Sequence, residues 1–272
     1  MPPVKIPATY YQQFDADYAR AIPAEGYGGW KKGDIEIAPE HTALVIMHAW
    51  EAGTMEQWPG WRRCVEYHPR ALRILSEVFP PLLTAVRAST LPVFHVVGGR
   101  DYYSHLPGYQ RAVKLAGPSP TYAAVAKDPV YEKLEKFRGD NVFVGARNRP
   151  DVDAGWKFLD FAPPARPVGE EYIAEDGHQL AAVCRATGVN HLVYIGFAIN
   201  WCLLMSPGGM VDMGRYGVMC STIAEAVTAV ENGETARLEL EKRQALWRVA
   251  INSGFVFGLQ DFTQMVKALP RK

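Results

Sequence analysis

The feature that most constrains the fold is a short apolar run in the second half of the chain. Residues 191–197, HLVYIGF, are almost continuously apolar and follow a Gly-Val-Asn turn at 188–190. A run of this length without polar alternation is typical of a strand buried on both faces of a parallel sheet. It therefore predicts an α/β protein.

Strand and helix patterns alternate along the rest of the chain. The apolar runs 42–48 and 91–97 predict two further strands, and residues 69–89 between them have helical spacing, interrupted at Pro80 and Pro81. Together they form a βαβ unit, which should be right-handed and parallel. Further strands are expected at 169–174, as a central strand, and at 216–222 and 255–259; helices are expected at 179–187, 235–249 and 262–269.

We predict one α/β domain over residues 41–272, a doubly wound parallel sheet of three α/β/α layers. Residues 1–40 are interpreted as an arm over the domain or a neighbouring subunit, with a short helix at 10–20. Residues 50–66 are expected to be a loop. Residues 98–168 are interpreted as an insertion or lid, with a helix at 130–137 and a short strand at 141–144.

Charge and motif content narrow the class of partner. Lys plus Arg and Asp plus Glu both number 29, so no basic excess indicates nucleic acid or an anionic membrane. No GxGxxG follows a strand and no phosphate-binding P-loop occurs, so no nucleotide cofactor is expected. The sequence shows neither a secretory signal nor an apolar stretch near the roughly 18 residues of a membrane span. We therefore expect a cytoplasmic protein that acts on a small molecule without a cofactor.

One of four cysteines stands at a chemically favourable place. The four are Cys64, Cys184, Cys202 and Cys220, without CxxC or zinc-site spacing, and each is expected to be a free thiol. Cys202 follows the 191–197 strand at its carboxyl end, where open α/β sheets bind ligands. If Asn200 caps a helix that begins there, the free N–H groups favour a thiolate nucleophile. The alternative is a buried apolar side chain, as most free cysteines are.

Four segments carry a family resemblance: 42–50, 91–97, 169–202, which contains the turn Gly-Phe-Ala-Ile-Asn-Trp-Cys at 196–202, and 216–231. In this order they resemble the isochorismatase-like cysteine hydrolases, which include nicotinamidases and N-carbamoylsarcosine amidases. The resemblance implies a doubly wound parallel sheet and, usually, a homo-oligomer. It also implies an Asp–Lys–Cys triad whose thiolate attacks a carbonyl carbon. Cys202 matches the nucleophile, and the bond between Phe197 and Ala198 matches a cis peptide that helps to aim backbone N–H groups at an oxyanion.

The other two triad positions depart from that pattern. His48 stands where the family has its aspartate, and Glu175 is nearest to the position of its lysine. Other acidic candidates for that position are Glu170, Glu171 and Asp176. One hypothesis is a rebuilt triad of Cys202, His48 and Glu175 that hydrolyses a C–N bond in an amide or ureide, with His48 as base. The other is a catalytically inactive small-molecule-binding or scaffold protein, and fold alone does not decide between them.

Aromatic residues near these positions suggest a substrate pocket. The candidates are Trp50, Trp201, Tyr102 and Tyr103, together with Phe197 and Ala198. The alternative is that these rings pack in the core or against another subunit. Asp101 and His105 have a DxxxH spacing that some relatives use for a metal, but no third ligand is evident and no metal is expected.

Overall fold

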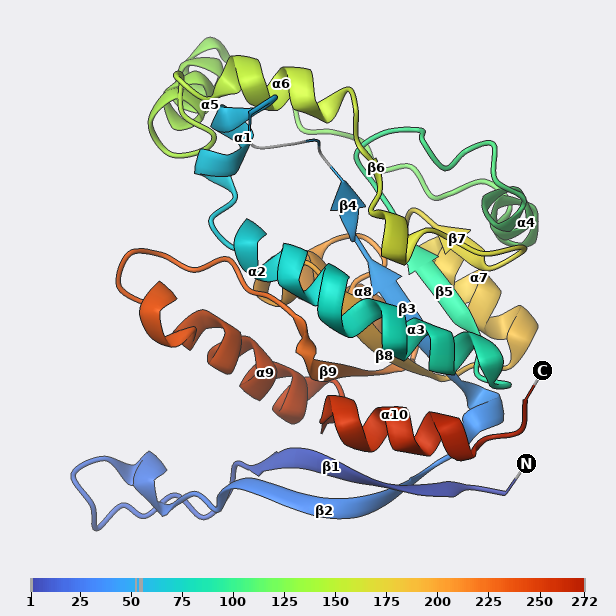
Figure 1. Cartoon of the computed structure of the whole chain (residues 1–272). Coiled ribbons are helices and arrows are strands. Elements are labelled where there is room, and N and C mark those ends of the chain that lie inside the picture. The colour runs from blue at the N-terminus through green and yellow to red at the C-terminus, as the bar shows by residue number, and fades with distance from the viewer. Residues whose placement is uncertain (1, 52, 54–55, 272) are drawn as a thin grey trace.

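The computed structural model describes residues 2–51, 53 and 56–271. Its centre is an eight-stranded sheet in the order β2-β1-β10-β9-β8-β3-β5-β7, with helices on both faces (Figure 1). The six strands from β10 to β7 are mutually parallel, whereas β1 and β2 are antiparallel. The predicted doubly wound parallel sheet is therefore confirmed.

The parallel strands follow the apolar runs of the sequence. They are β3 (Thr42–Met47), β5 (Val93–Val96), β7 (Tyr172–Ala174), β8 (His191–Gly196), β9 (Met219–Val227) and β10 (Val256–Phe257). Every residue of β3 and β8 is buried, which explains their continuous apolar character. The prediction of a central strand at 169–174 is wrong in its place, because β7 lies at the edge of the sheet, where α4 packs against it.

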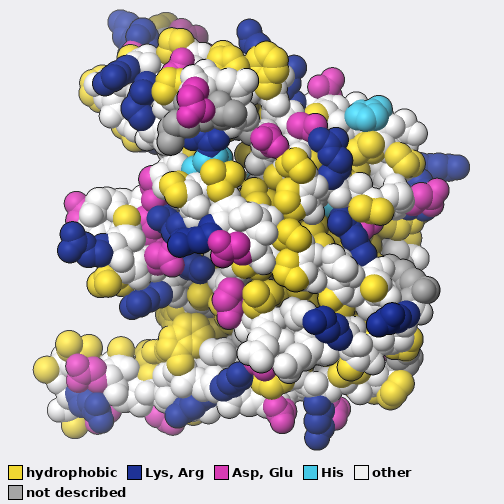
Figure 2. Space-filling model, in the orientation of Figure 1, with side chains coloured by type: hydrophobic (Ala, Val, Ile, Leu, Met, Phe, Trp, Pro, Cys, Tyr) yellow, Lys and Arg dark blue, Asp and Glu magenta, His cyan; other side chains and the backbone are white. Residues whose placement is uncertain are grey.

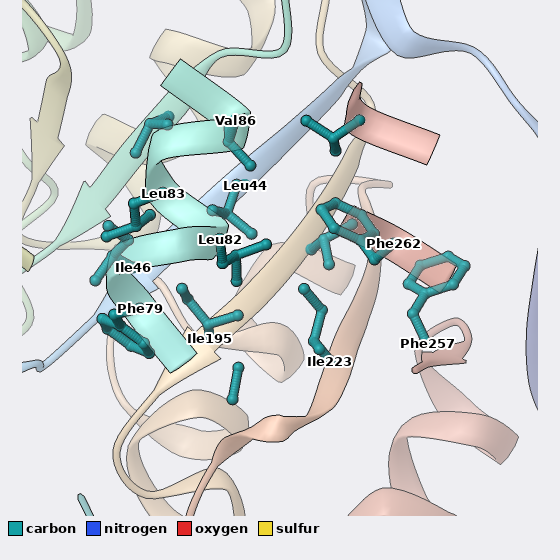
Figure 3. Packing of buried hydrophobic residues seen from close by; sticks show 14 of the residues in the cluster. Leu44, Ile46, Phe79, Leu82, Leu83, Val86, Ile195, Ile223, Phe257 and Phe262 are labelled. Carbon is teal, nitrogen blue, oxygen red and sulfur yellow. The ribbon is translucent and has the colours of Figure 1, made fainter. Parts of the chain in front are cut away.

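The two faces of the sheet are covered by different helices. Leu44 and Ile46 of β3 point into one core, under α3 (Phe79–Ala88) and α10 (Leu259–Ala268), as Figure 3 shows. Val45 and Met47 point into the other core. That second core is covered by α7 (Gly177–Thr187), α8 (Met210–Gly214) and α9 (Leu240–Asn252).

Helix boundaries follow local signals. The two helical pieces expected at 69–89 are found as α2 (His68–Arg73) and α3, but a π-helical turn (Ile74–Val78) joins them, so the path stays helical. Pro80 and Pro81 lie in the first turn of α3, where no N–H is needed. Helix α7 begins with Asp176 accepting a hydrogen bond from the Gln179 N–H, and it ends at Gly188 with φ 71°.

The helix expected over residues 235–249 begins later than predicted. Residues Ala236–Leu238 form a single 3-10 turn, and α9 starts only after Glu239, whose left-handed backbone has φ 50°. The left-handed residue interrupts the helical path, so the two segments are distinct elements.

The helix predicted at 10–20 is wrong. Strands β1 (Val4–Gln12) and β2 (Gly29–Ile37) form an antiparallel hairpin that extends the sheet along the lower edge in Figure 1. Ile6 and Ala8 alternate into the core beside α10, so the period of this segment is that of a strand. Thr9 pairs with Val256 of β10, a partner that local pattern cannot reveal.

The segment 98–168 carries three helices and a short strand. They are α4 (Pro107–Ala116), α5 (Pro129–Asn141), α6 (Arg149–Trp156) and β6 (Asp160–Phe161). The helix predicted at 130–137 is confirmed as α5. The strand predicted at 141–144 is wrong, because the N–H groups of Val142 and Phe143 turn back to the Arg138 carbonyl and close α5.

The predicted loop at 50–66 contains β4 (Trp50–Glu51), which pairs with β6, and α1 (Pro59–Cys64). The expectation of a wholly irregular loop is therefore wrong. Among the described residues, no helix is both long and apolar enough to cross a membrane.

Removing a ring from the core in Figure 3 should be costly. Phe79 is fully buried, between α3 and the sheet, so Phe79→Ala should lower the free energy of unfolding by about 3–5 kcal/mol. Urea denaturation measures this. Leu72→Ala, on the exposed side of α2, is the control and should change it by no more than about 0.5 kcal/mol. Equal effects of the two substitutions would contradict this account of the core.

Candidate active site

The carboxyl ends of four neighbouring strands form one row. The strands β8, β3, β5 and β7 end in register at Gly196, Met47, Val96 and Ala174. The next residues remain tied to neighbouring strands: the Phe197 N–H donates to the Met47 carbonyl (3.2 Å), the His48 N–H to Val96 (3.1 Å) and the Val97 N–H to Ala174 (2.9 Å). The sheet thus brings Phe197, His48 and Glu175 to the carboxyl ends of its strands, where α/β proteins bind ligands.

Cys202 lies in the first helical turn beyond β8. The peptide between Phe197 and Ala198 is cis, and the Ala198 carbonyl then accepts hydrogen bonds from the N–H groups of Trp201 (3.2 Å) and Leu203 (3.1 Å). This closes a turn over Ile199–Leu203.

The prediction that Asn200 caps this turn is wrong. Ala198 occupies the cap position, and the Asn200 amide exchanges two hydrogen bonds of 2.8 Å with the backbone of Val230. Asn200 therefore ties the turn that carries Cys202 to the segment after β9.

Burial determines the resting state of the Cys202 thiol. Burial raises its pKa, and hydrogen bonds from the Ser206 side chain and the Ala198 backbone act in the opposite direction without outweighing it. The thiol is therefore protonated at neutral pH, and the helical turn alone does not produce the expected thiolate. For this sulfur to act as a nucleophile, a base would have to take up its proton.

Two neighbours of Cys202 were missed from the sequence. Burial raises the pKa of Tyr67, and charge on Cys202 and Glu66 adds to this effect, which places the phenol near the sulfur. Ser206 lies four residues after Cys202, so helical spacing was a usable signal for it. No local signal was available for Tyr67, because it comes from the start of α2, far away in the sequence.

His48 is held as a neutral imidazole. Its backbone is left-handed, with φ 51°, and its ring stacks on Trp50 with centroids 4.5 Å apart. Burial lowers the pKa of His48 to about 4, against an opposing hydrogen bond to the Val97 backbone. Its Nδ1 atom is buried and has no hydrogen-bond partner among the described residues. At neutral pH His48 can therefore accept a proton.

Glu175 lies at the carboxyl end of β7, as predicted, but its carboxylate is hydrogen-bonded to residues other than His48. Its carboxylate accepts hydrogen bonds from the Tyr103 hydroxyl and the Gln179 amide, both at 3.0 Å. In the part of the chain that the structure describes, no hydrogen bond joins it to His48. Strand β5 separates their strands, so their backbones lie roughly 10 Å apart. That Glu175 orients His48 stays a prediction.

The other acidic candidates lie elsewhere. Glu170 and Glu171 precede β7 and so lie at the opposite end of that strand, where Glu171 contacts Arg87 and His95 at 2.8 Å each. Asp176 is the cap of α7. Glu175 is thus the acidic residue that directly follows β7.

The aromatic residues predicted to line a substrate pocket have two different environments. Trp50 donates its indole N–H to the Tyr102 hydroxyl (2.8 Å), and the cavity between this pair and His48 is only about 10 Å³, barely the size of one water. Tyr103 is 6% exposed, and the Phe197 ring stacks on Phe79. Trp50 and Tyr102 therefore form a packed wall behind His48, whereas the Tyr103 and Phe197 rings are core contacts.

The remaining two candidates differ in exposure. Trp201 is 56% exposed beside Cys202, whereas Ala198 is buried and contributes its backbone. Among the described residues, no group of three or more His, Cys, Asp or Glu side chains is placed to hold a metal, including those around Asp101 and His105.

No protein-family profile matches this chain, and no curated protein matches it. Several solved structures are similar to this chain. A cysteine hydrolase from Pseudomonas syringae pv. phaseolicola is 14% identical with a TM-score of 0.47, over 85% of this chain and 95% of that one. An isochorismatase family protein from Desulfovibrio vulgaris is 17% identical with a TM-score of 0.46, over 83% and 98%.

The N-carbamoylsarcosine amidase from Thermoplasma acidophilum is 13% identical with a TM-score of 0.39, over 80% of this chain and 96% of that one. Nicotinamidase from Staphylococcus aureus is 12% identical, with a TM-score of 0.33, over 80% and 99%.

The protonated thiol predicts slow labelling at neutral pH. Because burial raises its pKa, Cys202 should react with iodoacetamide more slowly than a free thiol at pH 7, with a midpoint above the usual value of about 8.5. Mass spectrometry of the labelled peptide, with protein unfolded in urea as the control, measures this. A midpoint below 8.5 in the folded protein would contradict the assignment.

The buried imidazole predicts a loss of stability in acid. The unfolded chain takes up a proton at His48 near pH 6.5, but the folded protein does so only near pH 4, so this residue lowers stability as pH falls from 6.5 to 4 and has no such effect above 6.5. His48→Gln removes the titration. Its urea midpoint should therefore fall less than that of the wild type between pH 7 and pH 5, and an equal fall in both proteins argues against a buried neutral His48.

Proposed function

We propose that this protein is a hydrolase that cleaves the C–N bond of a small amide or ureide, with Cys202 as nucleophile and His48 as base. The observations that support the proposal are a partly buried thiol one helical turn beyond β8 and, directly after the neighbouring strand β3, a buried His48 whose Nδ1 has no hydrogen-bond partner among the described residues. A protonated thiol and a neutral imidazole are the starting states that general-base activation needs.

In the first step the Cys202 proton moves to Nδ1 of His48 while the sulfur attacks the substrate carbonyl carbon. The resulting thiolate and imidazolium attract each other, and the Ala198 N–H and the Ser206 hydroxyl further stabilise negative charge on the sulfur. A C–S bond forms, and the carbonyl oxygen becomes an oxyanion. In the proposed reaction, backbone N–H groups of the turn that carries Cys202 stabilise this oxyanion.

In the second step the C–N bond breaks, and the nitrogen leaves with the proton that His48 returns. The product is a thioester on Cys202. A water molecule, deprotonated by His48, then attacks the thioester carbon, the C–S bond breaks, and the sulfur regains a proton. The net reaction adds one water across the C–N bond and needs no cofactor.

The test is ammonia or amine release from a panel of primary amides, ureides and N-carbamoyl compounds. Wild-type protein should release ammonia or amine from at least one compound class, and Cys202→Ser should abolish release. Cys64→Ser is the matched control, because Cys64 is also a partly buried free thiol and should be dispensable. Release that survives in Cys202→Ser would exclude this nucleophile.

The base has its own prediction. His48→Gln should lower kcat/KM about 10²–10⁴-fold, the usual contribution of general-base catalysis. Glu175→Gln should lower it less, because the Glu175 carboxylate is bonded to Tyr103 and Gln179 whereas the Val97 backbone already holds the His48 ring. A Glu175→Gln loss as large as that of His48→Gln would instead support Glu175 as the residue that orients the base.

A second function has two observations in its favour. The raised pKa of Cys202 and the engagement of Glu175 away from His48 both suit a protein that binds a small molecule at this edge without turning it over. A compound from the panel that raises the melting temperature without releasing ammonia or amine, equally in wild type and Cys202→Ser, would favour that binding function.

A further inference from the structure

Helix α5 has no buried residue, and only Gly139 and Asp140 at its C-terminal end are partly covered. Every residue from 117 to 138 is exposed, although the segment contains a helix whose cap, Asp128, accepts hydrogen bonds from the N–H groups of Val130 (2.7 Å) and Tyr131 (3.0 Å). Figure 1 shows α5 at the outer edge of the molecule, near α1 and α6. A helix of this length is marginal in water without tertiary packing, so an external contact is expected to stabilise it.

One face of α5 is apolar. Val130, Leu134 and Phe137 have the i, i+4, i+7 spacing of a single face, Tyr131 adjoins them, and each is about half exposed or more. Val142 and Phe143, also exposed, continue the patch just past the helix. Figure 2 shows apolar side chains among mixed charges on the lobe at upper left, where Figure 1 places α5. We call these six residues the α5 patch.

The size of the patch suits a symmetric pair. From the 150–250 Å² that an aromatic side chain can bury, the patch offers on the order of 600 Å² per copy and 1,200 Å² for two. That is the lower end of the range for specific interfaces, about 1,200–2,000 Å² in total. An area on the order of 600 Å² also lies at the upper end of the range for the largest apolar patch on a typical monomer, about 300–600 Å².

The charges beside the patch are self-complementary. Lys133 and Asp140 are seven residues apart and so lie along the same flank of α5. If two copies of α5 pack antiparallel around a two-fold axis between Lys136 and Phe137, Lys133 of one copy faces Asp140 of the other, twice.

From these features we infer that the α5 patch is an interface with a second copy of this chain, in which two α5 helices pack antiparallel about a two-fold axis. Such an isologous contact uses one patch on both copies and closes at the dimer. The charges of Lys133 and Asp140 cancel, so the flank has no net charge from this pair, which favours self-association over binding of a strongly charged partner. Asp140 now pairs with Lys136 of its own helix, and this largely exposed pair costs little to rearrange.

The first test is the mass of the purified full chain in solution, measured by sedimentation equilibrium. The wild type should be a dimer, and Leu134→Glu should raise the dimer dissociation constant at least a hundredfold by placing a charge in the apolar face. Leu238→Glu is the matched control, since Leu238 is 57% and Leu134 59% exposed, and it should leave the constant unchanged. A monomeric wild type, or a dimer that survives Leu134→Glu, would overturn the inference.

The second test addresses the register. Lys133→Glu and Asp140→Lys each place like charges opposite one another and should weaken the dimer about tenfold, whereas the double variant should restore it to within about threefold of the wild type. Circular dichroism of each variant checks that α5 remains folded. A double variant no tighter than the single ones would overturn the antiparallel register proposed here.

Discussion

The structure depends on the in-register burial of β3 and β8 between two apolar cores. Their continuous apolar runs allow helices to cover both faces of the sheet, and parallel pairing then aligns the carboxyl ends of β8, β3, β5 and β7. Every group in the proposed chemistry is placed relative to that row. His48 and Phe197 directly follow two of its strands, and Cys202 lies one helical turn beyond.

Burial gives the site its chemical character. The same exclusion of water that raises the pKa of Cys202 lowers the pKa of His48, so both groups are neutral near pH 7. A preformed ion pair is therefore not the resting state. In the proposed reaction, proton transfer therefore accompanies attack on the substrate, and the Ser206 side chain and the Ala198 backbone stabilise the sulfur once it carries charge.

The segment between β5 and β7 has two distinct parts. Near its start, Tyr102 packs with Trp50 of β4 as an aromatic wall behind His48. Further along, α5 turns apolar side chains outward. The sequence pattern predicts α5 because helical spacing is local. It does not say whether an apolar face meets its own chain or another molecule.

The sequence by itself determined the elements whose signals are local. These are the buried strands β3 and β8, the helix α7 that was expected at 179–187, and the position of Cys202 just beyond β8. Only the tertiary structure decided that β1 is a strand of the sheet, that β7 lies at its edge, and that Tyr67 lies near Cys202. It also gave Glu175 partners other than His48. These outcomes depend on contacts between residues far apart in the chain, and periodicity along the chain carries no information on which distant segments pair.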